Sequence, residues 1–229
     1  MHGKAQKGCV LMCEFQRLTF KSKEEWRNQR KRIGGSDAAA ILGLNPWKTN
    51  VDLWMEKTGQ AKSPDISGKE FVQYGVAAEP LIRSLFALDF PQFDVQYYGD
   101  NLILNDKFPF GAASLDGELV ERNTGRKGIL EIKTTNILQS SQREKWNGKV
   151  PDYYYVQCIH YLMMTGYEFV VLVAQLKSEF NGELTKQTKH YFIEREDVLE
   201  DIKILQEKEA EFWKCVEERR RPNLVLPAV

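Results

Sequence analysis

The sequence predicts an α/β fold in which a mixed β-sheet is flanked by helices. Segments with helical periodicity alternate with strand-like stretches, and no repeat, linker or low-complexity segment interrupts the 229 residues. An apolar share of 42% and a charged share of 28% are ordinary for a globular protein, and this length can bury a full hydrophobic core. We therefore expect one domain over residues 1–229, with residues 1–14 as a flexible leader.

Four helices are expected in the first ninety residues. They are Lys21–Lys31, Asp37–Leu42, Asn50–Thr58 and Glu70–Leu88. Ser22 and Glu25 have the spacing of a capping box at the start of the first helix. Gly43 and Gly59 follow the second and third helices, where glycine commonly ends a helix. The fourth helix has apolar residues at helical spacing.

Strands are expected in the middle of the chain. Three strand-like stretches are Asn101–Leu104, Gly111–Val120 and Gly128–Thr134. The last two are joined by a polar loop around Gly125, which is typical of a β-hairpin. A helix then begins at Pro151, since proline is well tolerated in the first turn, and ends at Gly166.

The last third of the chain continues the alternation. Phe169–Leu176 is nearly all apolar, as in a strand that is buried on both faces. The Asn181-Gly182 dipeptide predicts a tight turn, with Thr188–Ile193 as the partner strand. The final helix, Asp197–Glu218, has an apolar stripe along one side.

Charge and cysteine content exclude several classes of protein. No apolar run is long enough to span a bilayer, and the first residues do not form a secretory signal. Four scattered cysteines and three histidines fit neither a disulfide framework nor a zinc site, so we expect a cytoplasmic protein. Net charge is zero, but Arg17–Arg32 contains seven basic and two acidic residues. Such a segment can bind phosphates, or it can be a solvated helix face.

The strongest chemical signal lies in the third predicted strand. Because side chains alternate along a strand, Glu131 and Lys133 share one face while Leu130 and Ile132 point to the other. A metal-assisted hydrolase uses such a pair, since the carboxylate binds a hard cation and the ammonium orients or helps to deprotonate water. Asp116 lies fifteen positions upstream, at the end of the preceding strand. A hairpin would bring both acids together to bind one or two Mg²⁺ ions.

Each part of this pattern has a simpler interpretation when it stands alone. Asp116-Gly117 is an ordinary turn dipeptide. An acid two residues before a lysine also occurs at Asp201 and Lys203, in the final predicted helix, where we expect no chemistry. The strand context and the upstream partner acid distinguish Glu131 and Lys133 from that second case.

Five stretches in a fixed order resemble a known family. They are Arg32–Gly43 with Asn45-Pro46-Trp47, Gly75–Pro80, Ser114–Gly117, Leu130–Thr135 and Val150–Tyr161. Each stretch is weak alone, but together they resemble the YqaJ-type viral recombinase family. This family is related to phage lambda exonuclease within the PD-(D/E)xK nuclease superfamily. The resemblance implies a restriction-endonuclease-like core.

The resemblance also implies a metal site. Asp116, Glu131 and the backbone carbonyl of Ile132 would ligate the metal. Lys133 would lie beside the nucleophilic water. Glu79, on the long helix, would add a carboxylate from the side, although the sequence alone slightly favours a solvated helix acid there.

Further residues would bind DNA or face the site. Arg32 and Ser36 would bind a DNA phosphate, which agrees with the anion affinity of a Gly-Gly-Ser loop that opens a helix. Alternatively, Ser36 or Asp37 is simply the N-cap. Gln157 and Tyr161 lie four residues apart and share a helix face. The resemblance turns them toward the active site, whereas composition alone would assign an aromatic stripe to the core.

As a whole, the resemblance implies a Mg²⁺-dependent exonuclease, in which Mn²⁺ can substitute. It would resect linear double-stranded DNA from 5′ to 3′ for a single-strand annealing protein, in the cytoplasm of the bacterial host of a phage or prophage. A homotrimer is implied by analogy. The cysteines lack the pattern of the relatives that carry an iron–sulfur cluster, so none is expected. A structure- or site-specific endonuclease and a non-catalytic DNA-binding module are the alternatives.

Overall fold

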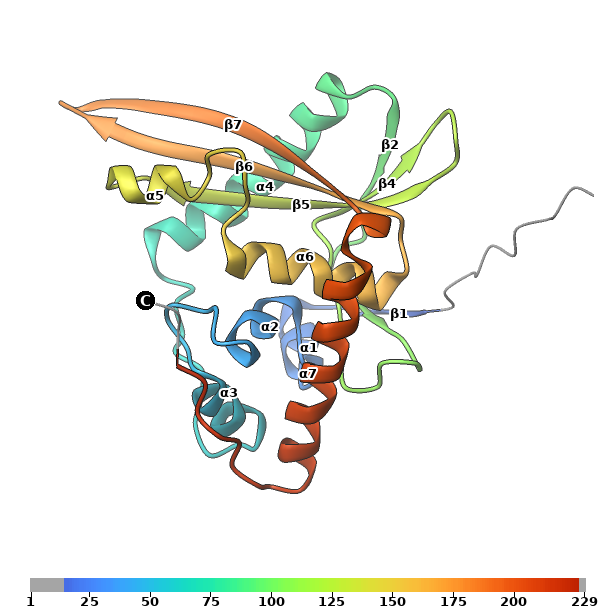
Figure 1. Ribbon diagram of the computed structural model, residues 1–229. Helices are drawn as coiled ribbons and strands as arrows, with labels where there is room; N and C mark the ends of the chain where they lie inside the picture. Colours follow the sequence, from blue (N-terminus) through green and yellow to red (C-terminus); the bar gives the residue numbers. More distant parts are fainter. Residues whose placement is uncertain (1–14, 227–229) are drawn as a thin grey trace, which may run out of the picture.

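The computed structural model describes residues 15–226 and is built around a five-stranded sheet (Figure 1). The strands lie in the order β2 (Phe93–Gln96), β4 (Gly117–Glu121), β5 (Lys127–Asn136), β6 (Phe169–Phe180) and β7 (Glu183–Glu194). β5 and β6 are parallel, and the other neighbouring strands are antiparallel. A separate two-stranded sheet is formed by β1 (Gln16–Thr19) and β3 (Asn101–Leu104). The mixed sheet confirms the predicted α/β class.

Helices cover both faces of the sheet. The helices of the described residues are α1 (Lys23–Gln29), α2 (Gly35–Ile41), α3 (Asn50–Lys57), α4 (Glu70–Asp89), α5 (Ser140–Glu144), α6 (Asp152–Thr165) and α7 (Leu199–Glu217). The 3₁₀ turn η1 (Arg195–Val198) precedes α7. Residues of α4 form one hydrophobic cluster with the sheet, and those of α2, α6 and α7 form the other. α6 lies between the sheet and α2 and α7, so all its residues from Val156 to Thr165 are buried.

Strand β5 shows the alternation that the sequence predicts. Leu130 and Ile132 belong to the cluster on the α4 side, whereas Ile129 belongs to the cluster on the α6 side. Glu131 therefore points toward α6. The antiparallel register pairs Gly117 with Leu130, which places Asp116, just before β4, level with Glu131. The predicted hairpin is confirmed, and its loop contains Gly125 at φ 74°.

Several predicted boundaries need correction. β4 is shorter than the expected Gly111–Val120 strand because Gly111 makes an isolated bridge to Ile33, just before α2, and Ala113 makes one to Ile103 in β3. The expected strands Phe169–Leu176 and Thr188–Ile193 are cores of a longer hairpin, since β6 and β7 continue to pair beyond the apolar stretch. Strands β1 and β2 and helix α5 were not predicted.

Other predictions are confirmed closely. Helix α4 begins at the expected residue, and α6 ends at Gly166, whose left-handed φ of 68° suits glycine. Ser22 caps α1 by accepting a hydrogen bond from the backbone of Glu25. The expected leader, residues 1–14, lies outside the described residues. Within the described part of the chain, no helix is long and apolar enough to cross a membrane.

Candidate active site

Two carboxylates from adjacent strands form the centre of the candidate site. Asp116 Oδ2 accepts a hydrogen bond from the backbone N–H of Ile132 at 2.8 Å, which fixes the Asp116 carboxylate against β5. Glu131 is 1% exposed, and its Oε1 accepts a hydrogen bond from Gln157 Nε2 at 2.7 Å. The same Oε1 lies 2.6 Å from Lys133 Nζ. The structure thus brings together the acid pair and the lysine that the sequence predicted.

One oxygen of this cluster has no partner. Glu131 Oε2 is buried and makes no hydrogen bond, whereas Oε1 binds both Gln157 and Lys133. A buried carboxylate oxygen without a partner is costly, because its desolvation is not offset by a hydrogen bond. The polar contacts of Glu131 therefore all lie on one side of its carboxylate, and the other oxygen is free to bind a ligand.

The electrostatics of the acid pair also favour a bound cation. Burial, followed by the charge of Asp116, raises the pKa of Glu131 to about 8, although Lys133 acts in the opposite direction. Burial also raises the pKa of Asp116, against the lowering effect of Lys133 and of the Ile132 N–H. Two acids held close together in a buried site resist ionisation, and a divalent cation between them would relieve this.

Lys133 is held as a cation. Burial alone would lower the pKa of its ammonium, but the charges of Glu131 and Asp116 outweigh burial and hold this pKa above its ordinary value. The side chain is 18% exposed, and its Nζ lies 5.0 Å from the centre of the Tyr154 ring. The ammonium is thus fixed by the carboxylate on one side and by an aromatic ring on the other.

Gln157 and Tyr161 connect α6 to the acid pair. Gln157 Nε2 donates to Tyr161 Oη at 2.8 Å as well as to Glu131. Both residues are also buried, at 7% and 6% exposure, so they belong to the core even though Gln157 contacts the acid pair. They pack against Gly35 so closely that a Cβ atom there would lie 2.6 Å from Tyr161 Cε1 and 2.9 Å from Gln157 Cγ.

Glu79 reaches the edge of the site from α4. It forms an ion pair with Arg83, whose Nε donates to the backbone carbonyl of Asp116 at 2.6 Å. Burial, followed by the charge of Asp116, raises the pKa of Glu79. The Glu79 carboxylate therefore lies close enough to interact with the charge of Asp116, but it is paired with Arg83. It is not the freely solvated helix acid that the sequence alone would suggest.

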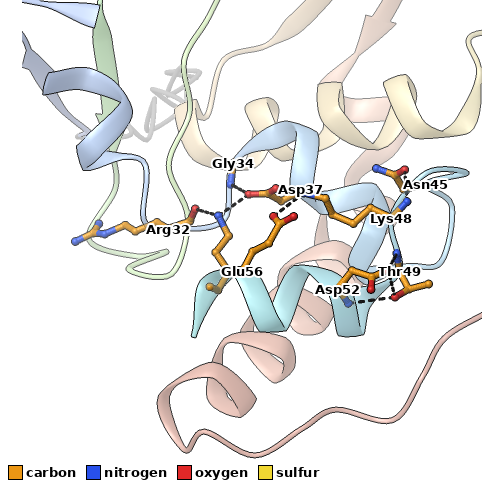
Figure 2. Close-up of polar contacts among 9 residues, drawn as sticks. Arg32, Gly34, Asp37, Asn45, Lys48, Thr49, Asp52 and Glu56 are labelled. Carbon is orange, nitrogen blue, oxygen red and sulfur yellow. Dashed lines mark hydrogen bonds and ion pairs between the residues drawn. The ribbon is translucent and has the colours of Figure 1, made fainter. Parts of the chain in front are cut away.

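The Gly-Gly-Ser loop is held by a lysine from α3. Lys57 Nζ pairs with Asp37 at 2.7 Å and donates to the carbonyl of Arg32 at 2.7 Å, while the Gly34 N–H donates to Asp37 at 3.1 Å (Figure 2). Gly34 is the N-cap of α2, so neither Ser36 nor Asp37 has that role. In Figure 2 the side chain of Arg32 extends away from this network. Ser36 is exposed and Arg32 is half-buried.

A basic cavity surrounds this loop. It has a volume of about 580 Å³ and is lined by Arg27, Arg30, Arg32, Lys48 and Lys57, together with Ser36 and Tyr161. Its two lysines pair with its two acids, Asp37 and Glu56. None of its three arginines is in salt-bridge contact with a carboxylate within residues 15–226. Because Tyr161 lines this cavity and also bonds to Gln157, the cavity adjoins the acid pair.

The site fits a divalent cation bound by few protein ligands. Within the described residues, no group of three or more His, Cys, Asp and Glu side chains is arranged to hold a metal. The acid pair nevertheless offers hard oxygen ligands, one of them unpartnered, and Mg²⁺ typically uses one or two carboxylates with several waters. Cys158 and Cys215 are buried as free thiols at separate places in the core.

Several residues that shape the candidate site show no clear signal in the sequence. Arg83 lies one helical turn after Glu79, a spacing at which an acid and a base commonly pair. Tyr154 lies in the same helix as Gln157, but its contact with Lys133 depends on tertiary packing. Asp201 and Lys203 lie on helix α7 and not on a strand of the sheet.

The chain is similar in sequence to known proteins. Residues 25–168 match the sequence model of the YqaJ-like viral recombinase domain. The chain is 34% identical over 194 residues to the uncharacterized protein YqaJ of Bacillus subtilis (strain 168), and the match covers 84% of this chain and 56% of YqaJ. The chain therefore spans little more than half the length of this relative.

Solved structures share the fold. An alkaline exonuclease from Laribacter hongkongensis superposes with a TM-score of 0.65 at 19% identity, covering 86% of this chain and 94% of the other. A phage related exonuclease from Haemophilus somnus 129PT superposes with a TM-score of 0.55 at 12% identity, covering 82% and 96%. Because the sequence identities are so low, these similarities establish only the fold of the chain.

Proposed function

The chain belongs to the YqaJ-like viral recombinase family, and from this premise we propose that it is a metal-dependent DNA exonuclease. It would resect linear double-stranded DNA from 5′ to 3′ and supply the remaining strand to a single-strand annealing protein. The observation that carries the proposal is the pairing of half-buried Asp116 with buried Glu131 beside Lys133, with one unpartnered carboxylate oxygen. The shared fold with two structures named as exonucleases supports it.

Asp116, Glu131 and the carbonyl of Ile132 would hold the cation, which we propose to be Mg²⁺, with Mn²⁺ able to replace it. When bound, the cation supplies Lewis acidity, which polarises the phosphodiester and makes water more acidic. Gln157 and Lys133 both bind Glu131 Oε1, so they orient the carboxylate with its free Oε2 available for the cation. This preorganisation favours charge stabilisation without rearrangement during the reaction.

Lys133 would position water and stabilise negative charge. Its raised pKa keeps the ammonium protonated, so it donates hydrogen bonds to the attacking water or to a phosphate oxygen. Glu79, held by Arg83, would accept a hydrogen bond at the edge of the site.

Arg32 and Ser36 would hold a phosphate of the DNA. Both line the basic cavity next to the acid pair, where a planar guanidinium can bind phosphate oxygens in pairs. Tyr161 would complete the wall between this cavity and the acid pair. The strand would then lie with one phosphate in the basic cavity and the scissile phosphate near Glu131.

The test compares DNA ends with closed DNA. The protein is incubated with Mg²⁺ and either linear 5′-phosphorylated duplex or covalently closed circles, and Asp116→Asn is the inactive control. We expect digestion of the linear duplex alone, with nucleotides released from the 5′ ends. Cleavage of the circles would favour a structure- or site-specific endonuclease. If wild type digests neither DNA, and so does not differ from Asp116→Asn, a non-catalytic DNA-binding module would be favoured.

A further inference from the structure

A second cavity lies on the other side of the acid pair from the basic cavity. It has a volume of about 520 Å³ and lies among the α2–α3 loop, the start of α4, helix α5, the end of β5 and the first turn of α6. The residues that matter are Trp47, Phe71, Tyr153, Tyr154, Lys145 and Lys177. We refer to it as the aromatic cavity.

The aromatic walls of this cavity are unusually open. Trp47 is 74% exposed and Phe71 is 53% exposed, although both are large apolar side chains. Trp47 contacts Tyr153 edge-on, with 5.1 Å between ring centres and an interplanar angle of 76°, so the flat face of the indole is not stacked on Tyr153. Exposed aromatic surface gathered in one cavity is typical of a binding site.

The charge of the cavity favours an anionic ligand. Lys145 and Lys177 belong to its lining, and no Asp or Glu does so among the described residues. Lys177 Nζ lies 3.4 Å from the centre of the Tyr74 ring, which holds this cation on the side of α4. Lysines interleaved with open aromatic rings are the combination by which proteins bind single-stranded nucleic acid, through phosphate contacts and base stacking.

The aromatic cavity is continuous with the candidate active site. Trp47 lines both this cavity and the basic one, and Thr135, on the same face of β5 as Glu131 and Lys133, also lines it. Along α6, Tyr153 faces the aromatic cavity, Gln157 the acid pair and Tyr161 the basic cavity. Eight helical residues span about 12 Å, at about 1.5 Å per residue. That length matches about three to four nucleotides at a stacked spacing of about 3.4 Å.

We propose that the aromatic cavity binds unpaired bases of the DNA strand next to the scissile phosphate, stacked on Trp47 and Phe71. In a duplex each base is covered by its neighbours, so only an unpaired base presents a face to Trp47. The cavity volume lies in the range of sites for small molecules, which suits one or two bases and not a duplex. This inference rests on the proposed nuclease function and adds the form of DNA that the site holds.

The test measures binding in EDTA, so that catalysis plays no part. Fluorescence anisotropy follows a labelled twelve-residue thymidine oligonucleotide and a blunt duplex of the same length. We expect Trp47→Ala to weaken single-strand binding by about 5- to 100-fold, the effect of losing one stacked base, and to weaken duplex binding less. Trp47→Phe should keep the affinity within about threefold, because phenylalanine still stacks. Binding of the oligonucleotide should quench the tryptophan fluorescence of the wild type, and Trp47→Phe should remove most of this quenching.

A matched pair of phenylalanines provides the control. Phe71 and Phe192 are both 53% exposed, but Phe192 lies on β7, outside the cavity. Phe71→Ala should weaken single-strand binding, whereas Phe192→Ala should not. Unchanged binding by Trp47→Ala, or equal losses for Phe71→Ala and Phe192→Ala, would overturn the inference.

The experiments distinguish a failure of the strand-binding proposal from a failure of the nuclease proposal. If wild type digests linear duplex while Trp47→Ala binds the oligonucleotide normally, the strand site is wrong and the nuclease stands. If no DNA is digested but binding still depends on Trp47 and Phe71, the nuclease is wrong and the chain is a single-strand binding module.

Discussion

Replacing Gly35 by alanine tests how the loop, α6 and the acid pair depend on one another. The new methyl carbon would lie 2.6 Å from Tyr161 Cε1, whereas ordinary contact begins at 3.4 Å, so the ring must move by about 0.8 Å. Tyr161 is 6% exposed and has little room to move. Because Tyr161 bonds to Gln157, and Gln157 to Glu131, the displacement reaches the acid pair.

The magnitude follows from three opposing effects. Overpacking in a dense interior costs about 1–3 kcal/mol, and loss of the hydrogen bond from Gln157 to the Glu131 carboxylate costs about 1.5–3 kcal/mol. The better helix propensity of alanine returns up to about 1 kcal/mol. We expect a net loss of about 1.5–6 kcal/mol, which lowers the Tm by roughly 3–24 °C in a chain of this size. Misplacement of Gln157 should lower kcat by about 10- to 100-fold.

The neighbouring glycine is the control for this prediction. A Cβ atom at Gly34 would meet only Arg30 Nη2 at 3.4 Å and Asp37 Oδ2 at 3.8 Å. Gly34→Ala should therefore cost less than about 1 kcal/mol, the usual effect at an N-cap. The assays are denaturant unfolding and DNA digestion with Mg²⁺. If Gly35→Ala and Gly34→Ala behave alike in both assays, the packing of Gly35 against α6 does not support the site and our reasoning is wrong.

Four further predictions concern the acid pair, the lysine and the basic cavity. Asp116→Asn should lower the rate of DNA digestion by at least about 10³-fold and abolish Mg²⁺ binding in calorimetry, since metal ligation supplies several kcal/mol of transition-state stabilisation. Lys133→Met should lower kcat by about 10²-fold in steady-state digestion with little change in KM, and an unchanged kcat would contradict the role of the ammonium. Because the pKa of Glu131 is raised to about 8 in the fold, the folded protein holds a proton that the unfolded chain releases, so this carboxyl destabilises the metal-free protein progressively as pH rises from about 4.5 to about 8. Relative to Glu131→Gln, the metal-free wild type should thus lose unfolding free energy between pH 5 and pH 8.5, and parallel curves would show that the pKa of Glu131 is not raised. Arg32→Ala should raise the KM for DNA about tenfold through the loss of charge-assisted hydrogen bonds, whereas Arg122→Ala, exposed in the β4–β5 loop, should leave it unchanged.

The local pattern of β5 was sufficient to predict the centre of the site. Alternation placed Glu131 and Lys133 on one face, and the glycine in the loop implied a hairpin whose register sets Asp116 level with Glu131. Both inferences use only the period of a strand and the geometry of a turn. Helix α4 could also be predicted, because Ala78, Ile82 and Phe86 recur at helical spacing and pack against the sheet.

Tertiary contacts could not be predicted from local sequence patterns in this way. The short strands β1 and β2 have four residues each and exist because they pair with β3 and β4, so their own composition carries little signal. The contacts of Lys57 with the loop, and of Tyr154 with Lys133, join residues that are distant in the chain. The aromatic cavity likewise collects side chains from five elements, and no local pattern could have grouped them.

The most direct test of the account is a crystal structure of the protein with Mn²⁺, in which anomalous scattering locates the ion. We predict a strong peak within about 2.0–2.4 Å of carboxylate oxygens of Asp116 and Glu131, including the unpartnered Oε2 of Glu131, and of the carbonyl of Ile132. A map with no peak between these two acids at saturating Mn²⁺, or with a peak only at other carboxylates, would contradict the central claim.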